Sequence, residues 1–157
     1  MAENSKGSFR CGYVAIIGRP NVGKSTIMNE LIGAKISITS RKAQTTRHRI
    51  LGIQTDDETQ FIYIDTPGFQ TRYSNPLNRN LNRTVKDTLT SADVILFVVD
   101  HDVFGLADKQ VLALIPKNVP TILVINKSDE VKDKAELMPF AKKMSEEWDF
   151  AAIVPIS

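Results

Sequence analysis

The stretch Gly18–Ser25 (GRPNVGKS) decides the fold, because it fits the pattern G-x-x-x-x-G-K-[ST]. The apolar run Tyr13–Ile17 before it predicts a buried strand, and the segment Lys24–Ile32 after it predicts a helix that ends near Gly33. Glycines let the backbone wrap a phosphate, and the loop N–H groups and helix N-terminus then face the anion. We therefore expect a phosphate-binding loop rather than a glycine turn with a chance lysine.

A second motif, Asp65–Gly68 (DTPG), directly follows the apolar run Gln60–Ile64. A carboxylate at such a strand end can hold Mg²⁺ through water, and the N–H of Gly68 can reach the γ-phosphate of a nucleotide. Alone, D-x-P-G is a common turn sequence. Downstream of a phosphate loop, it favours a nucleotide site.

The third motif, Asn126–Asp129 (NKSD), follows the buried run Thr121–Ile125 and selects the base. Guanine presents two donors on one edge, N1–H and the 2-amino group, and the carboxylate of Asp129 can accept both. Adenine offers an acceptor at N1 and would repel it. Asn126 can tie this loop to the phosphate loop, and the methylenes of Lys127 can lie over the purine.

Between the first two motifs, the polar segment Ser37–Ile50 lies where a phosphate-sensing switch loop is expected. Thr45 and Thr46 are candidates for a hydroxyl that reaches Mg²⁺ only when the γ-phosphate is present. The segment is also basic. We favour a solvated switch loop over an RNA-facing patch, and both readings rest on the same four cations: Arg41, Lys42, Arg47 and Arg49.

Apolar runs alternate with amphipathic ones along the rest of the chain, which indicates an α/β fold with a doubly wound, mainly parallel sheet and the nucleotide at the carboxyl ends of its strands. The short polar turn 55–59 predicts one antiparallel hairpin strand. Further strands are expected at 49–54, 94–99 and 151–156, and helices at 76–91, 107–115 and 132–148.

The 157 residues are 42% hydrophobic and 24% charged, with a net charge of +2, as in one globular domain. The single cysteine, Cys11, excludes an intrachain disulfide. No apolar run approaches the ~20 residues of a membrane span. We expect a cytosolic protein in which residues 1–11 form a flexible tail and 12–157 one domain. Trp148 is interpreted as core, and Asp100 and Asp102 as turn residues.

The last predicted strand has no helix after it, whereas earlier buried strands do. One face of the sheet would then be bare near its end. We interpret the domain as truncated before its last helix. The alternative is a sheet edge covered by a helix already described.

The segments GRPNVGKST (18–26), ISITSRKAQTTRHRI (36–50), DTPGF (65–69), NKSD (126–129) and VPIS (154–157) resemble the GTPase domain of the Era family, bacterial GTPases of ribosome assembly. The resemblance implies a small G domain that binds GTP or GDP with Mg²⁺. It also implies a switch function on the small ribosomal subunit and its 16S-type rRNA, and peripheral association with the inner face of the cell membrane. Era proteins bind RNA mainly through a C-terminal KH-type domain that this sequence lacks. No obligate protein partner is evident.

The predicted nucleotide-binding residues come from the three motifs and from the end of the chain, where Ile156 and Ser157 resemble a fifth guanine motif. They are Gly18, Arg19, Pro20, Asn21, Val22, Gly23, Lys24, Ser25, Thr26, Asp65, Thr66, Pro67, Gly68, Phe69, Asn126, Lys127, Ser128, Asp129, Ile156 and Ser157.

The predicted Mg²⁺ ligands are Ser25 and Asp65 from that set and Thr46 from the switch segment. The predicted catalytic residues are Lys24, Thr46, Gly68 and Asn21. In GTPases that resemble this one, an asparagine at the place of Asn21 helps to hold K⁺ against the phosphates. Ras-type GTPases orient the attacking water with a glutamine where this chain has Phe69, which predicts slow hydrolysis.

Three function classes compete on these residues: a switch GTPase, a P-loop kinase acting on a metabolite, and a nucleotide-binding module with a vestigial site or a non-ribosomal target. The NKSD quartet argues against the kinase. Lys24, Ser25 and Asp65 argue against a vestigial site.

Overall fold

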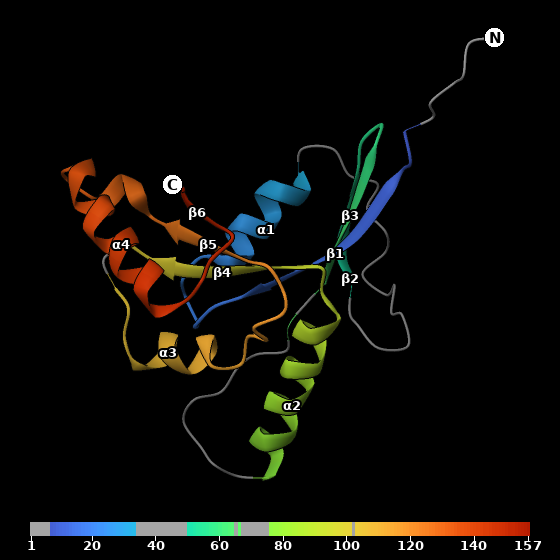
Figure 1. Ribbon diagram of the computed structural model, residues 1–157, viewed down its shortest axis with the longest axis horizontal. Coiled ribbons are helices and arrows are strands. Elements are labelled where there is room, and N and C mark those ends of the chain that lie inside the picture. The colour runs from blue at the N-terminus through green and yellow to red at the C-terminus, as the bar shows by residue number, and fades with distance from the viewer. Residues whose placement is uncertain (1–6, 34–49, 65, 67–75, 102) are drawn as a thin grey trace.

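A six-stranded sheet organises the computed structural model, which describes residues 7–33, 50–64, 66, 76–101 and 103–157 (Figure 1). Its order is β2-β3-β1-β4-β5-β6. Parallel pairing joins β3-β1-β4-β5-β6, and β2 pairs with β3 in the antiparallel sense. The prediction of a mainly parallel sheet with one antiparallel hairpin strand is confirmed. The strands are β1 (Arg10–Ile17), β2 (Ile50–Thr55), β3 (Thr59–Ile64), β4 (Val94–Asp100), β5 (Thr121–Asn126) and β6 (Ala152–Pro155).

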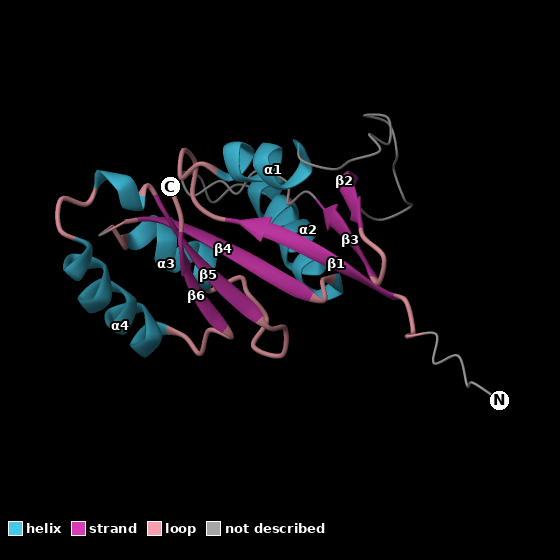
Figure 2. Ribbon diagram, turned by 90° about the horizontal axis from the view of Figure 1, so that it is seen from above, coloured by secondary structure: helices cyan, strands magenta, loops and turns pink. Residues whose placement is uncertain are grey.

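Helices cover both faces of this sheet, as Figures 1 and 2 show. On one face, Ile27 and Met28 of α1 pack against Val14 and Val98 of the sheet. The opposite face carries the larger core, to which α2, α3 and α4 all contribute buried side chains. The helices are α1 (Lys24–Gly33), α2 (Pro76–Ser91), α3 (Leu106–Leu112) and α4 (Leu137–Glu147), with short 3₁₀ turns η1 (Ser128–Glu130) and η2 (Lys134–Glu136).

Three predicted boundaries differ from the structure by three residues or more. β1 begins at Arg10, within the segment predicted as a tail. α3 ends at Leu112 rather than at residue 115. The helix predicted over 132–148 begins only at Leu137, after η1 and η2. Pro139 explains the late start, because proline is tolerated in the first turn of a helix and breaks its interior.

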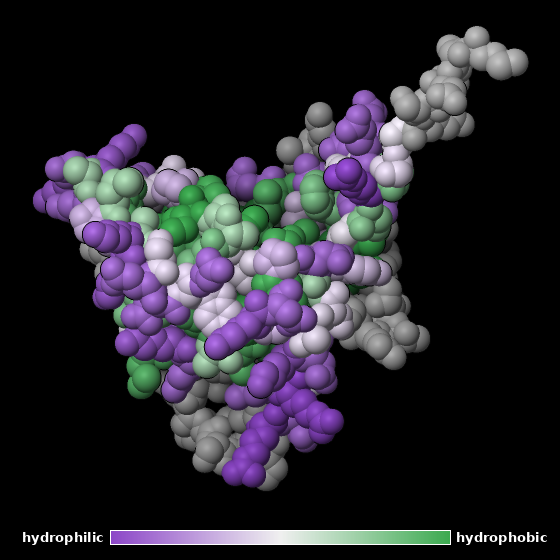
Figure 3. Space-filling view, in the orientation of Figure 1, coloured by the Kyte–Doolittle hydropathy of each residue, from purple (hydrophilic) through white to green (hydrophobic). Residues whose placement is uncertain are grey.

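The face of the sheet that carries α1 is incompletely covered near β6. Val154 of β6 is 41% exposed, whereas its partner in β5, Val124, is 6% exposed. Leu96 and Ile122 on the same face are only partly buried. Figure 3 shows hydrophobic residues gathered over β5, β6 and α1. The sheet therefore presents an apolar strip to solvent on this side.

Candidate functional site

The phosphate loop connects β1 to α1 and depends on two glycines for its shape. Gly18 lies so close to β4 that a Cβ there would be 2.6 Å from the carbonyl oxygen of Val98. Gly23 has a φ of +94°, and a Cβ there would overlap the amide nitrogen of Asn126. Asn21 also has positive φ, at 66°, a conformation that asparagine tolerates better than most residues. The loop conformation is therefore encoded by these three residues.

Lys24 folds its side chain back over this loop. Its Nζ donates to the carbonyl oxygens of Gly18 and Arg19, both at 2.8 Å. These bonds hold the ammonium at the mouth of the loop, where a phosphate would meet it. Ser25 and Thr26 follow in the first turn of α1 and are exposed. The arrangement offers an anion a cation and a helix N-terminus together.

The NKSD loop leaves β5 and contacts the phosphate loop directly. Asn126 donates from Nδ2 to the carbonyl oxygen of Val22 at 2.9 Å, across 104 positions of sequence. Lys127 adopts the left-handed conformation, with φ 59°, which turns the chain into η1. Asp129 lies exposed in η1. The predicted link from Asn126 to the phosphate loop is present.

Ile156, near the end of the chain, is hydrogen-bonded to the NKSD loop. The N–H and Oγ of Ser128 both donate to the carbonyl oxygen of Ile156, at 3.0 and 2.6 Å. Ile156 in turn donates its N–H to the carbonyl oxygen of Ile125 at 2.8 Å. Residues predicted from the VPIS segment thus lie beside the NKSD loop.

A charged network that the sequence did not reveal lies between the two loops. Arg19 pairs through Nη2 with Asp100 Oδ2 at 2.6 Å and through Nε with Asp108 Oδ1 at 3.2 Å. Lys127 Nζ lies 3.2 Å from the second oxygen of Asp100. Asp100, interpreted from sequence as a turn residue, is the last residue of β4 and connects both loops. Sequence spacing carries no signal for this, because the partners belong to separate segments.

The second motif is described only at Thr66, whose Oγ1 donates to the carbonyl oxygen of Ile16 at 2.8 Å. This bond places Thr66 beside the end of β1, where the phosphate loop begins. The remaining predicted site residues lie outside the described residues: Thr46, Asp65, Pro67, Gly68 and Phe69, with Thr45 and the basic residues of the switch segment.

Comparison with known proteins identifies the family. Residues 13–127 match the family model described as 50S ribosome-binding GTPase. The chain belongs to this GTPase family. That match spans the phosphate loop and ends at Lys127 of the NKSD loop, so it includes Asn126 and Lys127 but not Ser128, Asp129 or Ile156.

Among relatives of this GTPase-family chain, the GTPase Era of Nitrosomonas eutropha is 57% identical over 153 residues, covering 98% of the chain and 52% of the relative. The Era of Chromobacterium violaceum is 55% identical, covering 95% of the chain and 50% of the relative. The chain thus spans about half the length of the curated relatives it matches.

A solved structure of Era with MgGDPNP and nucleotides 1506–1542 of 16S ribosomal RNA matches with a TM-score of 0.75 and 39% identity, covering 95% of this chain and 51% of that one. Era of Aquifex aeolicus bound to GDP·AlF₄⁻ matches with a TM-score of 0.73 and 40% identity, covering 94% and 51%. The arrangement of strands and helices in this chain is therefore that of small GTPase domains.

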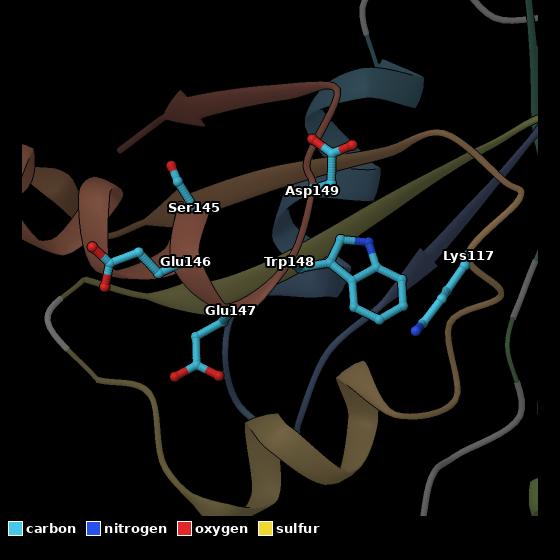
Figure 4. Close-up of a pocket in the computed structure, with 6 residues that line it drawn as sticks. All are labelled: Lys117, Ser145, Glu146, Glu147, Trp148 and Asp149. Carbon is cyan, nitrogen blue, oxygen red and sulfur yellow. The ribbon is translucent and has the colours of Figure 1, made fainter.

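A surface pocket of about 460 Å³ lies away from these loops in the GTPase-family fold (Figure 4). It is lined by Lys117 before β5 and by the segment Ser145–Asp149 at the end of α4, hence at the amino ends of the strands. Three of its six lining residues are acidic, which disfavours a nucleotide. The loops at the carboxyl ends are the better candidate for phosphate chemistry.

The described part of this GTPase-family chain shows neither a cluster of metal ligands nor a membrane-spanning helix. No set of three or more His, Cys, Asp or Glu side chains is grouped there as metal ligands. No helix in those ranges has the length and apolarity to cross a membrane.

Proposed function

We propose that this chain is the GTP-binding domain of a slow GTPase switch, which converts GTP and water to GDP and phosphate. The observation that carries the proposal is the hydrogen bond from Asn126 to Val22, because it joins a guanine-selective loop to a phosphate loop. Membership of a GTPase family supports it. The relatives named GTPase Era support the same reaction.

In this proposal each loop recognises one part of the nucleotide. The backbone N–H groups of the phosphate loop and the ammonium of Lys24 hold the phosphates, and Asp129 reads the guanine edge. Asn126 holds the two loops together, and Ser128 and Ile156 support the base-reading loop from behind. The N–H of Gly68 would contact the γ-phosphate, and the hydroxyl of Thr46 would reach Mg²⁺ only when that phosphate is present.

The residues at the start of α1 also fit a magnesium ion. Ser25 presents an exposed hydroxyl one residue after Lys24, and hydroxyl, carboxylate and phosphate oxygens are the ligands that Mg²⁺ prefers. We propose Ser25, Thr46 and Asp65 as its protein ligands. When bound, the ion would neutralise charge on the β- and γ-phosphates. The Era structure with MgGDPNP supports a magnesium ion bound together with the nucleotide.

Hydrolysis is proposed to be slow because Phe69 stands where Ras-type GTPases have the water-orienting glutamine. Phe69 has neither a donor nor an acceptor for a water. Asn21 is proposed to help hold K⁺ near the phosphates, where positive charge would offset charge that develops on the bridging oxygen. The exposed, positive-φ position of Asn21 in the phosphate loop supports this role.

The proposed target is the small ribosomal subunit and its rRNA. The support is the Era structure that contains a segment of 16S ribosomal RNA. That protein is about twice the length that this chain covers, so the RNA contact belongs to the proposal for the whole protein. Cytoplasmic location remains a prediction from the composition of the sequence, and peripheral membrane association remains a prediction from the resemblance.

A nucleotide competition assay tests the proposal. We expect GTP and GDP, with Mg²⁺, to displace a fluorescent GDP analogue, and ATP to fail at the same concentration. Preference for ATP would favour a P-loop kinase, and absence of Mg²⁺-dependent binding would favour a vestigial site. Either result would overturn the GTPase assignment.

A further inference from the structure

The carboxylate of Asp100 serves two loops at once. One oxygen, Oδ2, accepts from Arg19 of the phosphate loop at 2.6 Å. The other, Oδ1, lies 3.2 Å from the ammonium of Lys127, in the loop expected to read the base. Because each oxygen faces a different loop, the position of one cation constrains the other.

Asp108 holds the same arginine from its other side. It is 1% exposed, with one oxygen 3.2 Å from Arg19 Nε and the other accepting the N–H of Gly105 at 3.0 Å. The four charged side chains form two cations and two anions, so the network is electrically balanced. Asp108 thereby fixes Arg19 in place, which leaves Asp100 as the bridge to Lys127.

Two of the three ion pairs in this network, Arg19 Nε with Asp108 and Lys127 with Asp100, are electrostatic contacts without a hydrogen bond. Three of its atoms are buried without a hydrogen bond: Arg19 Nε, Asp100 Oδ1 and Asp108 Oδ1. Replacing partly buried ion pairs by packed apolar groups often costs no stability, so stability alone is a weak reason for such a network. Positioning is the better explanation, since Arg19 and Lys127 belong to the two loops that would enclose a nucleotide.

We propose that Asp100 is a positioning residue that couples guanine recognition to phosphate recognition, because it holds Lys127 of the base-reading loop and Arg19 of the phosphate loop in fixed positions relative to each other. The proposal rests on the proposed function, because it requires that both loops bind one nucleotide. It assigns to Asp100 a role in affinity for the intact nucleotide. In this proposal Asp100 does not contact the reacting atoms.

Asp100→Asn is the sensitive test, because it keeps the shape and removes the charge. Whichever way the amide turns, its NH₂ group faces either Arg19 or Lys127, and both are donors. We expect the Kd for a fluorescent GDP analogue to rise about tenfold, equivalent to about 1.4 kcal/mol. Asp100→Glu should recover part of that loss.

Asp93→Asn is the matched control. Asp93 also flanks β4, at its opposite end, and accepts the N–H of Tyr13 at 2.7 Å. It has the same charge change without a connection to the loops, and should bind the GDP analogue as the parent does. Melting temperatures without nucleotide are measured for every variant, so that unfolding is separated from loss of affinity.

Lys127→Met tests the bridge without touching Asp100. It keeps the methylenes that would cover the purine and removes the ammonium, and Lys127 is 39% exposed, so folding should be unaffected. We expect Lys127→Met to raise the Kd for the GDP analogue. We also expect Asp100→Asn to raise that Kd by a smaller factor in the Lys127→Met background than in the parent.

The outcomes separate the two proposals. If the parent chain does not bind the GDP analogue, the proposed function fails and this inference fails with it. If the parent binds and Asp100→Asn or Lys127→Met binds equally well, only the positioning role is overturned. Full additivity of the two substitutions would also overturn it.

Discussion

Asp129 lies exposed in η1, so its side chain can be changed without disturbing the core. In Asp129→Asn, one acceptor becomes a donor that faces a donor of guanine. Each buried polar group left unpaired costs ~1–3 kcal/mol, so GTP affinity should fall by that order. Xanthine has a carbonyl where guanine has its amino group, so affinity should move toward xanthosine nucleotides. Competition by GTP and XTP measures both changes, and unchanged GTP affinity would show that Asp129 does not read the base.

Asn21 offers a test of the potassium proposal. Its φ of 66° makes Asn21→Ala strained, so Asn21→Gly is the cleaner variant, since glycine accepts this conformation while removing the amide. We expect GTP turnover by the parent to be faster in KCl than in matched NaCl, and the difference to disappear in Asn21→Gly.

The size of that difference is expected to approach the lower range of arginine-finger effects, which are ~10³–10⁵. Equal parent rates in the two salts would contradict a role for K⁺. Rapid turnover by the parent without any added factor would contradict the slow-switch proposal.

At the scale of single elements, the crossing of the phosphate loop over β4 depends on Gly18. An alanine Cβ there would be 2.6 Å from the carbonyl oxygen of Val98, in a central strand that cannot easily move. We expect Gly18→Ala to lower the free energy of unfolding by about 1–3 kcal/mol, measured by urea denaturation. Gly7→Ala is the control, because a Cβ at Gly7 meets nothing within 4 Å. Equal midpoints for the two variants would disprove the close approach.

Strand β3 carries a buried phenol whose ionisation is linked to stability. Burial raises the pKa of Tyr63 above its ordinary value of 10.0, and its hydroxyl donates to Gln54 Oε1 at 2.9 Å. Above about pH 10 the unfolded chain ionises first, so this contribution to stability is present below that pH and is lost as pH rises.

Tyr63→Phe should therefore cost about 1 kcal/mol at neutral pH, for the lost hydrogen bond, and less at high pH. Urea denaturation of parent and variant at pH values on both sides of 10 measures this. A parent–variant difference that stays constant with pH would contradict the linkage.

Periodicity predicted each described strand and helix to within a few residues, except at the start of α4. There, the charged segment 132–136 continues a helical pattern, and only the conflict with Pro139 shows that the helix must start later. The phosphate and NKSD loops were predictable because their chemistry is encoded in contiguous residues. The Arg19–Asp100 pair was not, because it joins residues 81 positions apart and Asp100 belongs to none of the three motifs.

At the scale of the whole molecule, the apolar strip beside β6 can be tested with two paired valines. Val124 and Val154 are neighbours across β5 and β6, but one is 6% and the other 41% exposed. A buried hydroxyl without a partner costs ~1–3 kcal/mol, so Val124→Thr should be destabilising by that amount. Val154→Thr should stay within about 0.5 kcal/mol of the parent in urea denaturation.

Equal, large losses for both variants would mean that something covers the strip in solution. Sedimentation at several protein concentrations would then show whether the cover is a second copy of the chain. Equal, negligible losses would contradict the burial of Val124.

Trp148, the single tryptophan among the 157 residues, lies partly buried against the larger core and lines the pocket at the amino ends of the strands. The phosphate and NKSD loops lie at the other ends. Its indole emission should therefore change when the sheet unfolds and stay nearly constant when a nucleotide binds. One cuvette can then report two quantities: intrinsic fluorescence for the folded fraction, and an extrinsic nucleotide dye for occupancy, with little cross-talk between them.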